Sequence, residues 1–222
     1  MSVPGLGPSD PLHGLLLDTQ RRLETLYALE AEAPVVDFLI PQDQAHHYPG
    51  GGSRTLVAES GSDVEVGVVL EPEVARDLSL CDPRVLLDQS NLQAFCAATE
   101  EVSHFVYVLF CARWARSVTR LELELQGEVD KYLCAAFLLA LQNEGAVSHH
   151  LFELLFRHYD LAPGLSAEEA LRYRSASRLA ERYCGWLQQR FLRRAHLAEL
   201  AQEARRFYRL GQRQKLERIS SL

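Results

Sequence analysis

The spacing of apolar residues predicts a mainly helical chain with a short β-rich segment near its N-terminus. Apolar positions from Leu12 to Leu29 recur every three or four residues, which is typical of an amphipathic helix. Residues 35–40 form a short apolar run between two prolines and predict a strand. Residues 55–58 and 64–70 flank a Gly-containing turn and are rich in β-branched residues, so they predict a β-hairpin.

The rest of the chain carries helical periodicity and residues that favour helix starts. Ser90 can cap a helix N-terminus, and Thr119 with Glu122 forms the T-x-x-E pattern of a capping box. Ser166 with Glu169 forms a second capping box. The predicted helices span about residues 90–114, 119–145, 148–159, 166–194 and 197–219, the last with a break near Gly211.

These elements predict an α+β fold that is predominantly helical, a helical bundle with a small N-terminal antiparallel sheet. We expect residues 1–80 to hold the first helix and the sheet, and residues 81–222 to form a helical domain. A chain of 222 residues is also compatible with one continuous domain that includes both parts.

Composition favours a cytoplasmic globular protein. Hydrophobic residues make up 47% and charged residues 24% of the chain, an ordinary globular balance. No apolar run approaches the ~20 residues of a membrane span, and the N-terminus lacks the features of a signal peptide. The five cysteines have no CxxC spacing and are expected to be reduced core thiols. Abundant Arg, Leu and Ala beside few Lys indicate a GC-rich, bacterial genome.

The clearest sign of chemistry is a group of acids and one histidine within apolar helical segments. Glu100, Glu101 and His104 lie in one predicted helix, and Glu124 and Glu128 lie one turn apart in the next. Because the linker between these helices is short, we expect them to pair antiparallel and to bring His104 near Glu124 or Glu128. Buried carboxylates and imidazoles are costly unless they are paired or bind a metal, so the cluster is a candidate site.

The spacing of these residues resembles that of the gluzincins, the thermolysin-like metallopeptidases. Members of that family carry HExxH on one helix, a third zinc ligand Glu nineteen residues further on, and an acid four positions later. This chain has Glu100-Glu101-x-x-His104, nineteen residues, Glu124 and then Glu128. The resemblance implies metal ligands at His104 and Glu124, a general base at Glu101 and a supporting acid at Glu128. Glu100 stands where the family has its first histidine.

Two interpretations of the cluster follow from the residues. A metal site made from Glu100, His104 and Glu124 or Glu128 would suit Zn, Mn or Fe. The alternative is a structural latch in which His104 hydrogen-bonds Glu128 between the two helices. From the sequence we favour the latch, and with it a cytosolic interaction or regulatory protein rather than an enzyme. The rival function is a metal-dependent hydrolase with Glu101 as the base.

The C-terminal part is basic, whereas the rest of the chain is acidic. Residues 172–222 carry a net charge of +9 and the remainder −16, within the overall charge of −7. We expect the arginines to contact the acidic body, a second copy or another protein; nucleic acid is a third, disfavoured alternative because acidic surfaces repel polyanions. The candidate partner-binding residues are Arg174, Arg178, Arg182, Arg205, Arg206 and Arg209.

Overall fold

The computed structural model describes residues 11–30, 33–48, 50–60, 63–145, 149–157 and 165–222. Across these residues the fold is α+β and predominantly helical, with one two-stranded antiparallel sheet. The α-helices are α1 (Pro11–Tyr27), α2 (Pro72–Leu80), α3 (Leu92–Arg113), α4 (Arg120–Gln142), α5 (His149–Phe156), α6 (Ala167–Arg190), α7 (Leu197–Arg209) and α8 (Gln212–Ser220). The strands are β1 (Arg54–Ser60) and β2 (Asp63–Val69). The 3₁₀ turns are η1 (Val35–Phe38), η2 (Ala45–His47) and η3 (Leu192–Arg194).

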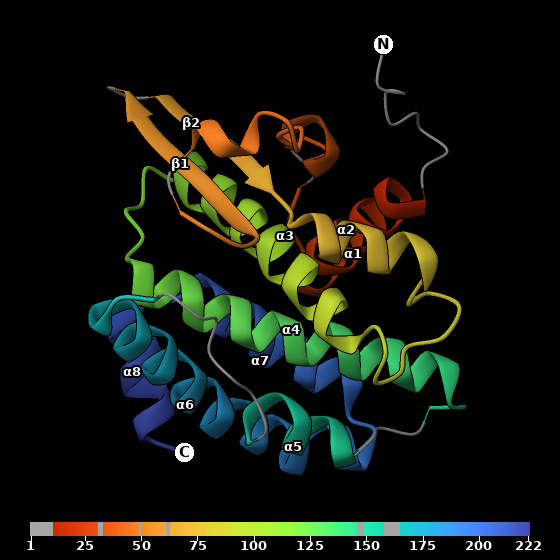
Figure 1. Ribbon diagram of the computed structural model, residues 1–222. Helices are drawn as coiled ribbons and strands as arrows, with labels where there is room; N and C mark the ends of the chain where they lie inside the picture. The colour runs from red at the N-terminus through yellow and green to blue at the C-terminus, as the bar shows by residue number, and fades with distance from the viewer. Residues whose placement is uncertain (1–10, 31–32, 49, 61–62, 146–148, 158–164) are drawn as a thin grey trace.

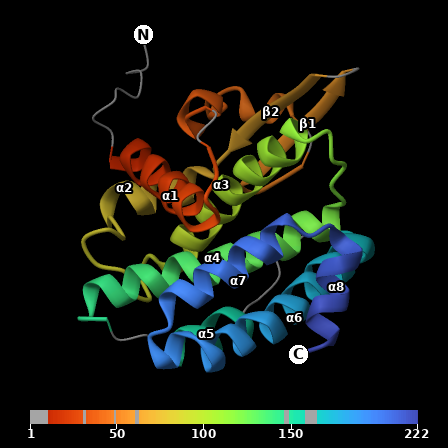
Figure 2. The ribbon, with the colours of Figure 1, turned by 180° about the vertical axis from the view of Figure 1, so that it is seen from behind.

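The central helices α3 and α4 run in opposite directions and pack against each other (Figures 1 and 2). The hairpin, α1 and α2 contact α3, and α5 and α6 contact α4. Figure 1 shows the hairpin, α1 and α2 on one side of the α3–α4 pair, with α5, α6 and α8 on the other. Facing residues of α3 and α4 therefore lie deep in the molecule. The predicted cluster of acids and one histidine comes from these two helices.

Helix α3 is long and apolar enough, by length and composition, to cross a membrane. However, 72% of its most apolar window is buried inside the protein. Its residues Val102, Phe105 and Tyr107 are each 0% exposed, so neighbouring elements cover most of its surface. A core helix surrounded in this way is expected to be apolar all round, and its composition needs no membrane to explain it.

The capping predictions are confirmed to different degrees. At α6 the Ser166 hydroxyl accepts a hydrogen bond from the Glu169 backbone, and the Glu169 carboxylate accepts one from the Ser166 backbone. At α4, Thr119 accepts from the Glu122 backbone, but the Glu122 carboxylate is used elsewhere. Ser90 is not the cap of α3, because the helix begins after Asn91 without a side-chain cap.

Other boundaries differ from the expected ones. The predicted final helix is two helices, α7 and α8, with the expected break at Leu210 and Gly211. Helix α2 was not predicted, and the expected ends at 148 and 159 lie outside the described residues. The strand predicted for residues 35–40 is wrong: most of it is η1, followed by a single bridge between Leu39 and Val68. The side chain of Gln20 accepts the hydrogen bond of the Val35 backbone amide, so no strand partner is needed there.

One hydrophobic core joins the two sequence ranges expected to form separate parts. Its buried residues extend from Leu12 on α1 to Ile219 on α8. A buried polar network crosses the same core: Asp130 on α4 accepts hydrogen bonds from Tyr27 and Gln126. Lys215 on α8 is 0% exposed and donates to Gln126 at 2.7 Å. Because buried polar groups must find partners, this network specifies where α1 and α8 dock.

Candidate metal centre

The α3–α4 pair brings three of the predicted ligands together. Glu100 and His104 are one turn apart on α3, so they lie on the same face of that helix. Glu124 is in the second turn of α4 and faces them. One ligand atom from each of Glu100, His104 and Glu124 lies within 4.8 Å of the others. Among the described residues this is the one group of acids, histidines and cysteines with such a geometry.

Two atoms of this group are buried without a hydrogen-bond partner. The Nε2 atom of His104 and the Oε2 atom of Glu124 lie 3.8 Å apart, too far for a hydrogen bond. The two residues are each only 7% exposed. Leaving buried polar atoms unpaired costs about 1–3 kcal/mol each, so the arrangement calls for a group that is shared between them.

Gly127 lets the backbone of α4 pack closely against the imidazole of His104, because it has no side chain. A Cβ atom at this position would lie 2.9 Å from His104 Nε2 and 3.3 Å from Glu100 Cγ. Glycine in a helix interior costs about 1 kcal/mol relative to alanine. Its presence in the middle of α4 therefore has a local reason: any larger residue would push the His104 ring out of its position.

The carboxylate of Glu101 is already engaged, which differs from its predicted role as a general base. Its Oε2 atom accepts a hydrogen bond from the Thr55 hydroxyl on β1 at 2.7 Å and lies 3.8 Å from His104 Nδ1. This places Glu101 behind the imidazole, on the opposite ring nitrogen from Glu124. At 3.8 Å the carboxylate makes an ionic contact with Nδ1 rather than a hydrogen bond, and it leaves Nε2 available as a ligand.

Glu128 does not join the group, nor does it form the predicted latch with His104. Lys131 binds Glu128 at 2.9 Å and Glu100 at 2.8 Å. The single ammonium group is thus shared by the two carboxylates and offsets one of their two negative charges. His104 instead lies at 3.8 Å from both Glu101 and Glu124, so the expected contact with Glu124 is confirmed and that with Glu128 is not.

Burial and mutual charge change the pKa values across the cluster. Burial lowers the pKa of His104, but Glu101, Glu124 and Glu100 outweigh it and raise the pKa to about 9. Burial raises the pKa of Glu124 to about 7, against the opposing effect of His104. Burial also raises the pKa of Glu100, yet Lys131 and His104 lower it below its usual range. Without a metal ion, the cluster therefore holds protons that a cation would replace.

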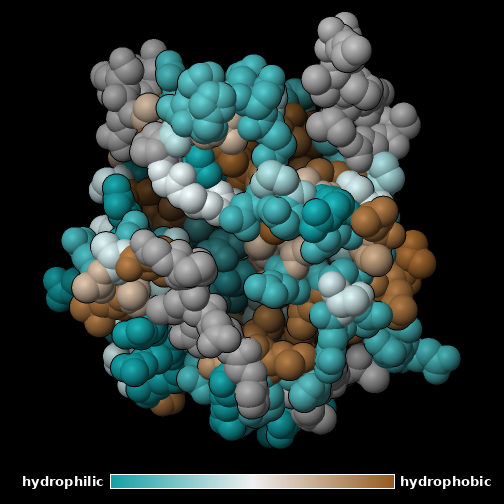
Figure 3. Space-filling model, viewed as in Figure 1, coloured by the Kyte–Doolittle hydropathy of each residue, from teal (hydrophilic) through white to brown (hydrophobic). Residues whose placement is uncertain are grey.

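The residues at the edge of the cluster are polar and partly exposed. The side chain of Glu100 is 17% exposed and that of Lys131 is 14% exposed. Arg172 on α6 lies at the other edge, with its Nε atom 3.5 Å from Glu124 Oε1. Figure 3 shows that this face of the molecule is hollowed between the hairpin and the helices below it, with hydrophilic residues at the bottom of the hollow.

Sequence reasoning missed four contributors to this site: Thr55, Gly127, Lys131 and Arg172. An isolated glycine within a strong helical pattern is a recognisable signal of close packing or function, so Gly127 was detectable. Lys131 follows Glu128 by three positions, which is the spacing of a helical ion pair. Nothing in the local sequence indicates Thr55 or Arg172, because only the packing of β1 and α6 brings them near.

The basic C-terminal helices meet the body of the protein through backbone carbonyls. Arg205 donates to the carbonyls of Leu26 and Thr25, and Arg209 donates to that of Tyr27, so both cap the C-terminal end of α1. Arg182 binds the carbonyls of Ser220 and Leu222. Arg206 is paired with Glu203 at 3.7 Å. Arg174 and Arg178 are exposed on α6.

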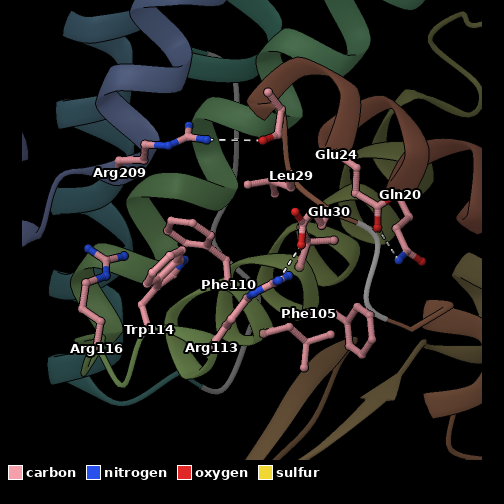
Figure 4. A pocket seen from close by; sticks show the side chains of 13 residues that line it. Gln20, Glu24, Leu29, Glu30, Phe105, Phe110, Arg113, Trp114, Arg116 and Arg209 are labelled. Carbon is pink, nitrogen blue, oxygen red and sulfur yellow. Dashed lines mark hydrogen bonds and ion pairs between the residues drawn. The ribbon is translucent and has the colours of Figure 1, made fainter.

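A cavity of about 530 Å³ lies where the ends of α1, α3 and α7 converge. Figure 4 shows Arg209 reaching the end of α1 and Arg113 reaching Glu30 across this cavity. Arg116, on its wall, donates to the carbonyl of Leu210 at 3.0 Å. The guanidinium groups around this cavity bind backbone carbonyls at helix ends and an acid of this chain. Their role is therefore structural.

No protein family, no curated protein and no solved structure matches this chain. The resemblance of Glu100, Glu101, His104, Glu124 and Glu128 to the gluzincin pattern therefore remains a prediction from spacing. What the chain can do must be argued from the chemistry of the cluster.

Proposed function

We propose that the protein binds one divalent transition-metal ion through Glu100, His104 and Glu124. The observation that carries the proposal is the pair of buried, unpartnered atoms, His104 Nε2 and Glu124 Oε2, next to the Glu100 carboxylate. A metal ion between the three side chains would satisfy both atoms at once. Glu101 is compatible with the proposal, since its carboxylate lies on the Nδ1 side of the ring and leaves Nε2 free for the metal.

The charges of the cluster favour a divalent ion. Four carboxylates, those of Glu100, Glu101, Glu124 and Glu128, lie within a region that contains Lys131 and Arg172 as the nearby cations. In the form that would bind a metal, with a neutral imidazole and ionised acids, two negative charges would stay uncompensated; in the metal-free cluster the raised pKa of His104, about 9, keeps a proton on the ring instead. Uncompensated charge is costly in a buried site, and a divalent ion removes it. One nitrogen and two oxygen ligands suit Zn²⁺, Mn²⁺ or Fe²⁺.

Metal binding without hydrolysis fits the surroundings better than a peptidase does. A hydrolase needs a base that can reach a metal-bound water. Glu101, the base implied by the gluzincin resemblance, is hydrogen-bonded to Thr55 and lies on the Nδ1 side of His104. We infer a structural or regulatory metal that ties α3 to α4, within the wider expectation of a regulatory protein.

Isothermal titration with Zn²⁺, Mn²⁺ and Fe²⁺, on protein stripped with a chelator, tests the proposal. We expect saturable binding of one ion per chain by at least one of these metals. His104→Asn should abolish binding, whereas the matched variant His196→Asn, at an exposed position before α7, should leave it unchanged. Elemental analysis of protein purified without chelator gives the metal bound during expression.

Three outcomes would contradict the proposal. One is the absence of heat and of bound metal for every ion tried. Another is binding that survives His104→Asn. The third is equal loss in the His196→Asn control, because that would locate the metal away from the cluster.

A second candidate function is protein–protein interaction, and one surface feature favours it. Leu80, Val85 and Leu86, in and after the last turn of α2, are 75%, 81% and 58% exposed. Apolar side chains clustered in one segment at this exposure are typical of contact surfaces. Light scattering after size exclusion tests whether the chain self-associates; Val85→Ser with Leu86→Ser should then shift it to monomer. A monomer at all concentrations would remove self-association as the role of this surface.

A further inference from the structure

A second cavity is lined by α1, α4 and α7. It has a volume of about 940 Å³ and lies between α1, the C-terminal half of α4, and the segment from η3 into α7. Figure 2 shows α7 crossing in front of α4 below α1, and α1 and α7 contact each other. The volume is at the upper end of the range of small-molecule sites, about 300–1,000 Å³. It shares no lining residue with the proposed metal centre.

The floor and walls of this cavity are apolar. Cys134 and Phe137 of α4 lie at its base, and Leu192 of η3 and Leu26 of α1 line its sides. Small residues keep it open, among them Ala140, Ala195 and Ala201. Leu141 and Leu197 at its edge are 69% and 54% exposed, an unfavourable state for large apolar side chains in water. Such a lining is suited to bind a hydrocarbon chain or another apolar group.

The rim is positively charged. Arg21 and Arg22 bind the same carboxylate, Asp18, each at 3.2 Å. Arg205 lines the cavity too and donates to the backbone carbonyls of Leu26 and Thr25. Among the lining residues the three guanidinium groups face one carboxylate, which leaves two positive charges in excess. The complementary ligand group is an anion, and a planar carboxylate fits a guanidinium fork.

The hydrogen bonds from Arg205 also decide between a small ligand and a partner helix. They join α7 to α1, and Arg205 itself lines the cavity, so the two helices are tied together along one edge of the space. A partner helix, about 10 Å across with its side chains, needs an open groove over several turns. A flexible chain that enters from one end needs none.

We propose that this cavity binds a long-chain fatty acid, with its hydrocarbon tail against Phe137, Leu192 and Ala201 and its carboxylate at Arg21 and Arg22. The apolar floor supplies the affinity, since each buried methylene contributes about 0.8 kcal/mol in transfer from water. The arginine rim selects the acid over an uncharged chain of the same length.

Displacement of a fluorescent fatty acid, dansyl-undecanoic acid, from delipidated full-length protein tests the inference. We expect saturable binding of the probe at one site and displacement by palmitic acid. Hexadecanol, which lacks the charge, should be weaker by about tenfold, since hydrogen bonds to charged groups are the stronger ones. Hexanoic acid, which lacks most of the apolar chain, should not compete.

Variants locate the site. Ala201→Phe fills the cavity from α7 and should remove probe binding, whereas Ala198→Phe, one turn away at an exposed position outside the lining, should keep it. Arg22→Gln leaves the floor intact, so it should weaken palmitic acid to the level of hexadecanol without changing hexadecanol itself. Thermal melts of each variant test whether it folds. If one variant does not fold, the comparison of ligands on the unmodified protein still tests the inference.

The inference is overturned by no saturable probe binding, or by equal affinity for palmitic acid and hexadecanol. It is also overturned if Ala201→Phe and Ala198→Phe behave alike, because the probe then binds elsewhere. Displacement of the probe by an acidic amphipathic peptide, but not by palmitic acid, would replace the fatty acid with a partner helix.

Discussion

The imidazole of His104 lies between two carboxylates from different helices, with Nδ1 3.8 Å from Glu101 and Nε2 3.8 Å from Glu124. One carboxylate is held by Thr55, whereas the facing Oε2 of Glu124 has no hydrogen-bond partner. The carboxylate on the Nδ1 side is therefore anchored by a hydrogen bond, and the carboxylate on the Nε2 side is not. Only the Nε2 side, towards Glu124 and Glu100, can take a metal ion.

Glu124→Gln therefore should separate metal binding from folding. The amide keeps the size of the side chain but removes the anionic ligand, so metal affinity should fall by more than about tenfold. Titration calorimetry measures the loss, and Glu199→Gln, an exposed acid on α7, is the matched control. Unchanged affinity in Glu124→Gln would exclude Glu124 from the ligand set.

Gly127→Ala should destabilise the protein although alanine is the better helix former. The new Cβ would lie 2.9 Å from His104 Nε2, and overpacking of this kind costs about 1–3 kcal/mol. Urea denaturation measures the change. In a His104→Ala background the nearer obstacle is gone and only the contact with Glu100 Cγ at 3.3 Å remains, so the same substitution should cost much less or stabilise α4, by at most about 1 kcal/mol. Equal effects in the two backgrounds would show that the ring and the glycine do not interact.

Lys131→Met should be among the most damaging substitutions in the cluster. It leaves the carboxylates of Glu100 and Glu128 without their cation, and breaking a buried ion pair costs about 3–5 kcal/mol. Denaturation in the presence of a chelator measures the loss of unfolding free energy. Adding Glu100→Gln and Glu128→Gln should recover much of it. A loss below about 1 kcal/mol would indicate that the three groups stay hydrated.

The buried Lys215 should make stability increase with pH. Burial lowers its pKa to about 7 in the folded protein, from an ordinary value near 10.5, despite the opposing charges of Glu122 and Asp130. Between these two values the unfolded chain binds more protons than the folded one. The unfolding free energy should therefore rise with pH across this window, by at most about 1.4 kcal/mol per pH unit.

Lys215→Met provides the control for this pH dependence, because it removes the titrating group while keeping most of the apolar stem. Denaturation of both proteins at pH 7, 8 and 9 gives the difference between them. That difference should move in favour of the unmodified protein as pH rises. A constant difference would mean that Lys215 stays charged in the core.

The periodicity of apolar residues and the capping residues were enough to predict most of the helices and the hairpin. These features act over a few residues: Ser166 and Glu169 bond each other's backbone whatever surrounds them. The same local logic predicted that a short linker would bring His104 close to Glu124. The strand prediction for residues 35–40 failed because a side chain from another element takes the hydrogen bond of a backbone amide there. The Val35 amide donates to Gln20 of α1.

Roles within the cluster required the tertiary structure. Glu101 is hydrogen-bonded to Thr55 of β1, on the Nδ1 side of the histidine. Glu128 is outside the proposed ligand set because Lys131 binds it together with Glu100. Arg205 and Arg209, predicted to meet acids or a partner, bind the carbonyls that end α1. The sequence by itself determined most of the helical segments, α2 and residues 35–38 excepted, and which residues could form a charged cluster, since both follow from spacing along one helix. Only packing decided which charges meet, because that depends on contacts between residues far apart in the chain.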